Sequence, residues 1–157
     1  MSTLLVAVDN SLIARKVTQL ASEQALAQSA DVVVLCCVDA SYAGPGNTLI
    51  IEAGEDPGDF GAALDEQNTA EAAVRMALSV LHAHGVRATG RVVAGESAQT
   101  IVAQANEVNA TMIVMGRRHL SSFNRLLKGS VSAAVIERAS CPVLVDVRDV
   151  KQVKTAS

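Results

Sequence analysis

The stretch that decides the fold is MIVMGRRHLSSFNRLLKGSVS, residues 112–132. An apolar segment ends at Gly116, and a cation-rich segment follows it. A second glycine, Gly129, then precedes the hydroxyl residue Ser130 at the expected start of a helix. Small residues and backbone N–H groups at a helix N-terminus are typical of a phosphate-binding site. We therefore predict a strand, a phosphate-binding loop and a helix, in this order.

Short apolar runs and helical patterns alternate through the rest of the chain. Runs rich in Val, Ile and Leu are typical of buried parallel strands, and right-handed crossovers place such strands in one sheet. We predict an α/β fold of the Rossmann-like type, a single-domain, doubly wound, five-stranded parallel sheet with four helices. The domain covers residues 1–147, and residues 148–157 form a polar tail. The predicted strands are 4–8, 31–38, 87–93, 111–115 and 143–147, and the predicted helices are 12–28, 62–84, 98–108 and 128–138.

Four local signals refine this arrangement. Gly85 is expected to end the long second helix, and Ser97 is expected to cap the third. Cys36 and Cys37 are adjacent in a strand, so their side chains should point to opposite faces as small buried hydrophobic groups. Residues 40–61 are predicted to be a loop with a small apolar anchor at positions 49–51. Whether this loop covers a ligand as a lid or is an irregular excursion stays open.

The composition excludes several classes of protein. A net charge of −3 argues against a general nucleic-acid surface, which needs a basic face. No apolar run approaches the roughly 18 residues of a membrane span, and the N-terminus lacks the features of a signal peptide. Three cysteines are too few for a disulfide framework. We expect a cytoplasmic protein with no membrane partner and no nucleic-acid partner.

The glycine spacing, together with other short segments, resembles that of a known family. Gly116, two residues, His119, nine residues, Gly129 and Ser130 follow the nucleotide-binding motif of the universal stress proteins, which carries Gly in place of His119. The resemblance covers nearly the whole chain. It includes the Asp-Asn-Ser turn at 9–11, Val-Ala-Gly-Glu at 93–96 and Ser-Cys-Pro-Val-Leu-Val at 140–145.

This resemblance implies a regulator or sensor of the stress response that binds ATP or a related adenine nucleotide such as AMP or cyclic AMP. Magnesium would bridge phosphates only. The family also implies a homodimer through the last strand, 143–147, and an unknown regulatory protein partner. The implied nucleotide contacts are Ala7 and Asp9 for adenine and ribose, Val38 for adenine with Cys37 as the alternative, Met115 and Gly116 for ribose and the first phosphate, Arg118 and His119 for the distal phosphates, and Gly129, Ser130, Val131 and Ser132 for the phosphate chain.

Two functional hypotheses stay open because of His119. If the motif requires a positive φ at this position, histidine tolerates it better than most residues, and nucleotide binding is retained. If the motif requires close approach of the backbone, the imidazole fills the phosphate path. The chain would then be a nucleotide-free homodimeric interaction module. An adenylyl-transferring enzyme is a third reading, but the sequence has no signature for it and no positioned base, so we expect no enzymatic activity.

Overall fold

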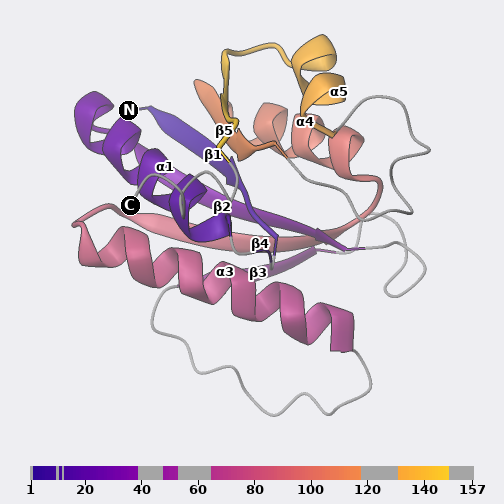
Figure 1. Ribbon diagram of the computed structural model, residues 1–157, viewed down its shortest axis with the longest axis horizontal. Helices are drawn as coiled ribbons and strands as arrows, with labels where there is room; N and C mark the ends of the chain where they lie inside the picture. The colour runs from indigo at the N-terminus through magenta and orange to yellow at the C-terminus, as the bar shows by residue number, and fades with distance from the viewer. Residues whose placement is uncertain are drawn as a thin grey trace.

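The computed structural model describes residues 2–9, 11, 13–38, 48–52, 65–117 and 131–148. Strands and helices alternate along most of this chain (Figure 1). No helix among the described residues is both long and apolar enough to span a membrane. The elements in chain order are β1 (Thr3–Ala7), α1 (Ala14–Gln28), β2 (Asp31–Val38), β3 (Thr48–Glu52), α3 (Asp65–Ala83), β4 (Ala88–Ala94), α4 (Ser97–Glu107), β5 (Met112–Gly116), α5 (Val131–Arg138) and β6 (Val143–Asp146).

The strands form one sheet in the order β3-β4-β2-β1-β5-β6. All neighbouring pairs are parallel except β3 and β4, which are antiparallel. The predicted α/β architecture with its doubly wound parallel sheet is confirmed, since β1 has a parallel neighbour on each side. The chain passes from β1 to β2 through α1 and from β4 to β5 through α4, as crossovers between parallel strands require.

Helices cover the sheet on both faces. Figure 1 shows α4 and α5 above the sheet and α3 below it. Alternate residues of each strand therefore belong to two separate cores. Leu4 and Val6 of β1 pack with α1 and α3, whereas Leu5, between them in sequence, packs with α4 and α5. The two adjacent cysteines follow the same alternation, with Cys36 in the first core and Cys37 beside the second, as predicted.

The sixth strand, β3, corrects the prediction of five strands. Residues 49–51 were expected to be an anchor within a loop, but they pair with β4 in register Ile51↔Gly90. Ile51 is 1% exposed and completes the core under α3, whereas Ile50 is 58% exposed. A five-residue strand has too few residues to show a clear alternation, and its stability depends on pairing with a distant strand.

The ends of two helices test the predicted capping residues. Gly85 has φ +78°, and Val86 N–H donates to Leu81 O at 3.0 Å, which is the hydrogen bond of a Schellman motif. Gly85 thus ends α3 as predicted. The prediction for Ser97 is wrong, because Glu96 is the N-cap and its carboxylate accepts from Gln99 N–H at 2.8 Å. A longer acidic side chain outcompetes the hydroxyl residue that follows it.

Candidate functional site

The candidate site is a pocket at the carboxyl ends of the strands. The sheet order reverses between β1 and β5, and open α/β sheets bind ligands at such a point. About 580 Å³ of empty space lies here, counted out to the solvent at its mouth. The lining residues are Ala7 of β1, Val8 and Asp9 after it, Ile13 before α1, Ala14 and Val17 of α1, Leu35 and Cys37 of β2, Ser97 and Ile101 of α4, Met115 and Gly116 of β5, and Val131 of α5.

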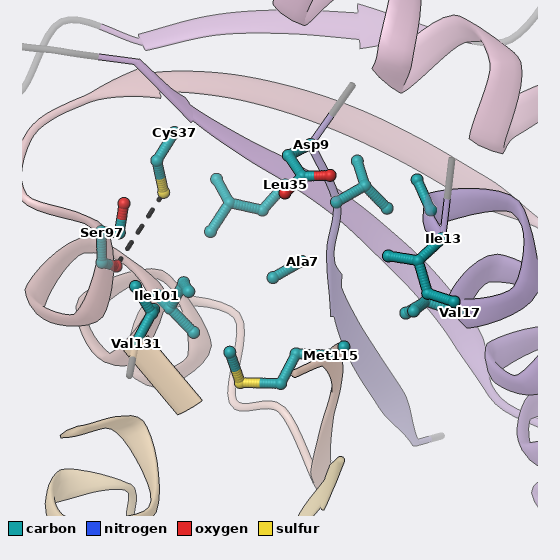
Figure 2. Close-up of a pocket in the computed structure, with 13 residues that line it drawn as sticks. Ala7, Asp9, Ile13, Val17, Leu35, Cys37, Ser97, Ile101, Met115 and Val131 are labelled. Atoms are coloured by element: carbon teal, nitrogen blue, oxygen red, sulfur yellow. Dashed lines mark hydrogen bonds between the residues drawn. The ribbon is translucent and has the colours of Figure 1, made fainter. Parts of the chain in front are cut away.

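Most of this lining is apolar. Figure 2 shows Cys37, Ser97, Ile101 and Val131 on one side and Ile13 and Val17 on the other, with Ala7 and Met115 between them. Ala7 pairs with Leu35 on one side and with Met115 on the other. Because its two neighbours are larger, the small Ala7 side chain leaves a trough at the centre of the pocket. Such a trough suits a flat apolar ligand group.

Strand register decides between Val38 and Cys37 as the residue of β2 in the site. Cys37 lies two residues after Leu35, so its side chain shares the face of Ala7 and Met115. Val38 points to the opposite face, where it is 5% exposed in the core under α1 and α3. The structure therefore places Cys37, the alternative residue, in the pocket and leaves the Val38 side chain outside it.

Asp9 supplies the acidic group of the pocket. Its Oδ1 accepts a hydrogen bond from Ser11 N–H at 2.9 Å, which fixes the turn between β1 and α1. A carboxylate has two oxygens and several lone pairs, so it can accept more than one hydrogen bond. An ionised carboxylate only accepts, and it therefore suits a ligand group with hydroxyl donors, such as a ribose.

Gly116 allows α1 to approach the end of β5. A Cβ at this position would lie 3.0 Å from Val17 Cγ2 and 3.7 Å from Ile13 Cγ2. These two side chains form one wall of the pocket. The glycine predicted from the phosphate-loop pattern thus has a packing role in addition to any contact with a ligand.

The other predicted site residues fall into two groups. Val131 begins α5 and lines the pocket, whereas Ser132 is 6% exposed within the helix and does not line it. The remaining predicted site residues, Arg118, His119, Gly129 and Ser130, lie outside the described residues. Most of the loop predicted at 40–61 also lies outside them. The pocket brings together Ala7, Asp9, Met115, Gly116 and Val131 from the predicted set.

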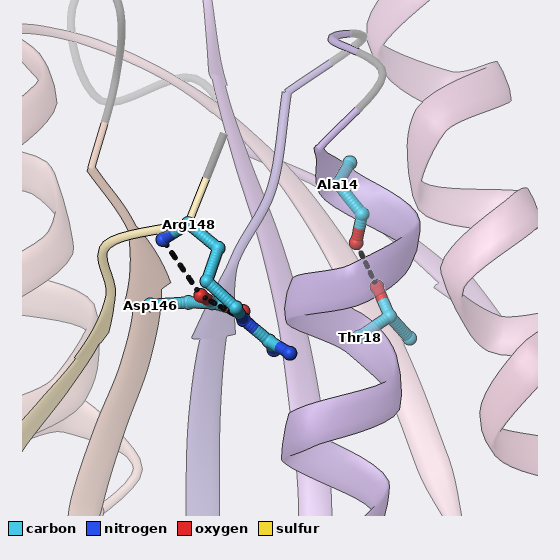
Figure 3. Close-up of polar contacts among 4 residues, drawn as sticks. All are labelled: Ala14, Thr18, Asp146 and Arg148. Atoms are coloured by element: carbon cyan, nitrogen blue, oxygen red, sulfur yellow. Dashed lines mark hydrogen bonds and ion pairs between the residues drawn. The ribbon is translucent and has the colours of Figure 1, made fainter. Parts of the chain in front are cut away.

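An ion pair joins Asp146, at the end of β6, to Arg148, whose side chain is about half exposed. Asp146 is 4% exposed, and its carboxylate accepts from Arg148 Nη2 at 2.7 Å and from Arg148 Nε at 2.9 Å (Figure 3). Asp146 O also accepts from Arg117 N–H at 2.9 Å, directly after Gly116. Arg148, the first residue of the predicted tail, is therefore tied to the domain. The hydrogen bonds from Arg148 lower the pKa of the Asp146 carboxyl below its usual 3.8.

This ion pair predicts a pH dependence of stability. A folded-state pKa below the unfolded one means that the unfolded chain binds more protons near pH 4. The stabilisation is complete above the unfolded pKa and is lost as the pH falls through the folded one. Arg148→Gln removes the side-chain hydrogen bonds and the positive charge that lower this pKa. We therefore expect the variant to be less stable than wild type at pH 7, and the difference in stability between the two proteins to shrink as the pH falls.

Thermal unfolding of both proteins between pH 2.5 and pH 7 measures this difference. Arg138→Gln, which changes an exposed arginine near the end of α5, is the matched control. Melting temperatures of wild type and Arg148→Gln that fall in parallel over the whole pH range would contradict the assigned role of the pair.

Comparison with known proteins identifies the family. The sequence pattern of the universal stress protein family matches residues 1–148 of the 157 in this chain. The chain belongs to the universal stress protein family. Universal stress protein Sll1388 from Synechocystis sp. is 29% identical over 154 residues, which cover 90% of this chain and 95% of Sll1388. Universal stress protein YxiE from Bacillus subtilis is 38% identical over 61 residues, and that match spans only 41% of its length.

Solved universal stress proteins have the same fold. One from Archaeoglobus fulgidus in complex with dAMP has a TM-score of 0.65 and 26% identity, covering 92% of this chain and 97% of the other. A second universal stress protein, in complex with cAMP, has a TM-score of 0.65 and 25% identity, covering 92% and 94%. Both ligands are adenine nucleotides.

Sequence reasoning missed the apolar walls of this site. Ile13, Val17, Leu35 and Ile101 line the pocket but were not predicted to do so. In the sequence they look like core residues, and Leu35, at 0% exposed, is also one. For Leu35, the alternation of side chains along a strand was the available signal. Leu35 lies two positions before Cys37, so both side chains point to the same face.

Among the described residues, no three His, Cys, Asp or Glu side chains come together as a candidate metal site. The charged groups near the pocket are dispersed. Asp9 lies at the end of β1, and Asp146 is occupied by Arg148. A cation in the pocket would therefore have to be held by the ligand rather than by a cluster of these side chains.

Proposed function

We propose that this universal stress protein binds an adenine nucleotide in the pocket between β1 and β5 and acts as a cytoplasmic regulator of the stress response rather than as a catalyst. The carrying observation is the position of the pocket, at the reversal of strand order and against the first residue of α5. The dAMP and cAMP complexes of two universal stress proteins support the choice of ligand.

The chemistry of the lining suggests how the nucleotide would lie. Ala7, Ile101 and Met115 offer an apolar surface for the base, and Asp9 offers acceptors for ribose hydroxyls. The phosphates would extend past Gly116 towards the start of α5, where backbone N–H groups and the helix dipole favour an anion. ATP, AMP and cyclic AMP share the adenine and ribose groups that this arrangement recognises.

We also propose a homodimer that pairs through β6. This strand ends the sheet order, and Val143, Leu144 and Val145 are all only partly buried. Val147 is 52% exposed, and Ile136 of the adjoining α5 is 57% exposed. An apolar strand at the edge of a sheet can pair with a second copy across a twofold axis.

Calorimetric titration with ATP, AMP and cyclic AMP, with and without magnesium, tests the nucleotide proposal. We expect micromolar binding by wild type and roughly tenfold weaker binding by Asp9→Asn, because hydrogen bonds to a charged group contribute about 1.5–3 kcal/mol. Glu137→Gln, which neutralises an exposed carboxylate on α5, should bind as wild type does. The mass of the protein in solution and ATP hydrolysis, measured on the same samples, test the dimer and the absence of catalysis.

A His119→Gly variant separates the two readings of the phosphate loop. Equal binding by wild type and variant would show that the loop accepts histidine. Binding by the variant alone would indicate a nucleotide-free interaction module with a site closed by one side chain. Binding by neither protein would contradict the nucleotide proposal.

A further inference from the structure

One wall of the pocket carries a polar pair in an otherwise apolar surface. The Cys37 thiol donates to the backbone carbonyl oxygen of Ser97, with 4.0 Å between Sγ and O, and both residues line the pocket (Figure 2). Cys37 comes from the end of β2, and Ser97 is the first residue of α4. The pair therefore joins two elements at the side of the pocket opposite Ile13 and Val17.

The apolar side chains beside this pair are almost fully buried. Ile101 is 3% exposed, Met115 is 4% exposed and Leu35 is fully buried. In such surroundings a carbonyl oxygen that loses its partner costs free energy. A thiol is a weak donor, and a separation of 4.0 Å makes this bond easy to displace.

A carbonyl oxygen accepts hydrogen bonds and never donates them. It has two lone pairs, so Ser97 O can accept from a ligand while remaining in the hydrogen-bond pattern of α4. A 6-aminopurine presents an exocyclic N–H donor to such an oxygen. A 6-oxopurine presents an oxygen instead, and two facing acceptor oxygens cannot form a hydrogen bond with each other.

We propose that the Ser97 carbonyl oxygen is the group that selects 6-aminopurine over 6-oxopurine nucleotides, with the Cys37 thiol as its exchangeable partner in the empty pocket. This inference rests on the proposed function, since it assigns base selectivity within the same site. Sites that hydrogen-bond a substrate group discriminate strongly against analogues that leave the partner unpaired.

Four nucleotide analogues titrated against the wild-type protein test this inference: AMP, purine riboside 5′-monophosphate, N6,N6-dimethyl-AMP and IMP. We expect AMP to bind about tenfold more tightly than the unsubstituted purine, which corresponds to one hydrogen bond. The dimethyl compound keeps the nitrogen but has no N–H, so it should not exceed the unsubstituted purine. IMP should bind most weakly, because its oxygen faces Ser97 O.

Three variants separate the carbonyl from neighbouring groups. Cys37→Ala removes the competing donor, so AMP should bind as tightly as to wild type or up to about threefold more tightly, with the ratio of AMP to IMP affinity retained. Ser97→Ala removes the hydroxyl but keeps the carbonyl, and it should also retain the ratio. Cys36→Ala, which changes the neighbouring thiol on the opposite face, is the matched control.

The outcomes distinguish this inference from the proposed function. Equal binding of AMP and IMP would overturn the inference and leave nucleotide binding intact. Loss of discrimination in Ser97→Ala would assign the selection to the hydroxyl, and loss in Cys37→Ala would assign it to the thiol, and either result would overturn the role of the carbonyl. Binding of none of the four analogues would overturn both the inference and the proposed function.

Discussion

Replacing Gly90 with alanine is expected to lower the free energy of unfolding by about 1–3 kcal/mol, which corresponds to a melting temperature lower by about 2–10 °C. Gly90 lies in β4 between β2 and β3, under α3. A Cβ there would lie 2.2 Å from Val74 Cγ1 and 3.3 Å from Leu78 Cδ1. Both side chains are almost fully buried, so neither can move without disturbing the core.

A double-mutant cycle with Val74→Ala shows whether this contact is the cause. Val74→Ala alone should cost about 2 kcal/mol, because it leaves a cavity. In the double variant the added methyl group occupies part of that cavity, so the total loss should fall short of the sum by at least about 1 kcal/mol. Additive losses would show that Gly90 is not required by the approach of Val74.

Gly85→Ala is the matched control for this cycle. No atom lies within 4 Å of a Cβ at Gly85, so a methyl group there meets no steric obstacle. Its φ of +78° gives alanine a backbone cost of about 1–2 kcal/mol. Since the cost has no steric part, Gly85→Ala and Val74→Ala should be additive, in contrast to the Gly90 pair.

Local patterns predicted most of the fold because the strands are long apolar runs and the helices end at clear signals. β2 and α3 are examples, the first an uninterrupted apolar segment and the second ended by Gly85. The antiparallel strand β3 was missed because its identity depends on pairing with β4, which lies far along the chain. A five-residue segment carries no local signal strong enough to show such a partner.

Of the residues that line the pocket, the sequence indicated Ala7, Asp9, Met115, Gly116 and Val131, whereas the side chains contributed by α1 and α4 were missed. Asp9 and Gly116 were recognisable because ligands of an open α/β sheet bind beyond the carboxyl ends of its strands, where both residues lie. Val38 was chosen over Cys37 because every residue of β2 from Val32 to Val38 is apolar, so the sequence does not show which face each one takes. Only the pairing of β2 with β1 shows which residues of β2 face the pocket.

The strongest effect on ligand binding is expected from Ala7→Leu. Ala7 lies between Leu35 and Met115 in the adjoining strands, and its small side chain leaves the trough in which the base would lie. A leucine side chain would project into this trough from its floor. We expect AMP affinity to fall at least tenfold, a loss of about 1.4 kcal/mol or more in binding free energy.

A control variant separates blockage of the pocket from a general effect on the protein. Ala103→Leu makes the same change at an exposed position of α4 and should leave AMP binding unchanged. Melting temperatures of both variants report whether either change disturbs the fold. Wild-type AMP affinity in a folded Ala7→Leu protein would place the nucleotide outside this pocket, because a base cannot share the volume of the added side chain in a close-packed wall. Weakened binding confined to Ala7→Leu would instead locate the base directly over the end of β1, between the side chains that β2 and β5 contribute.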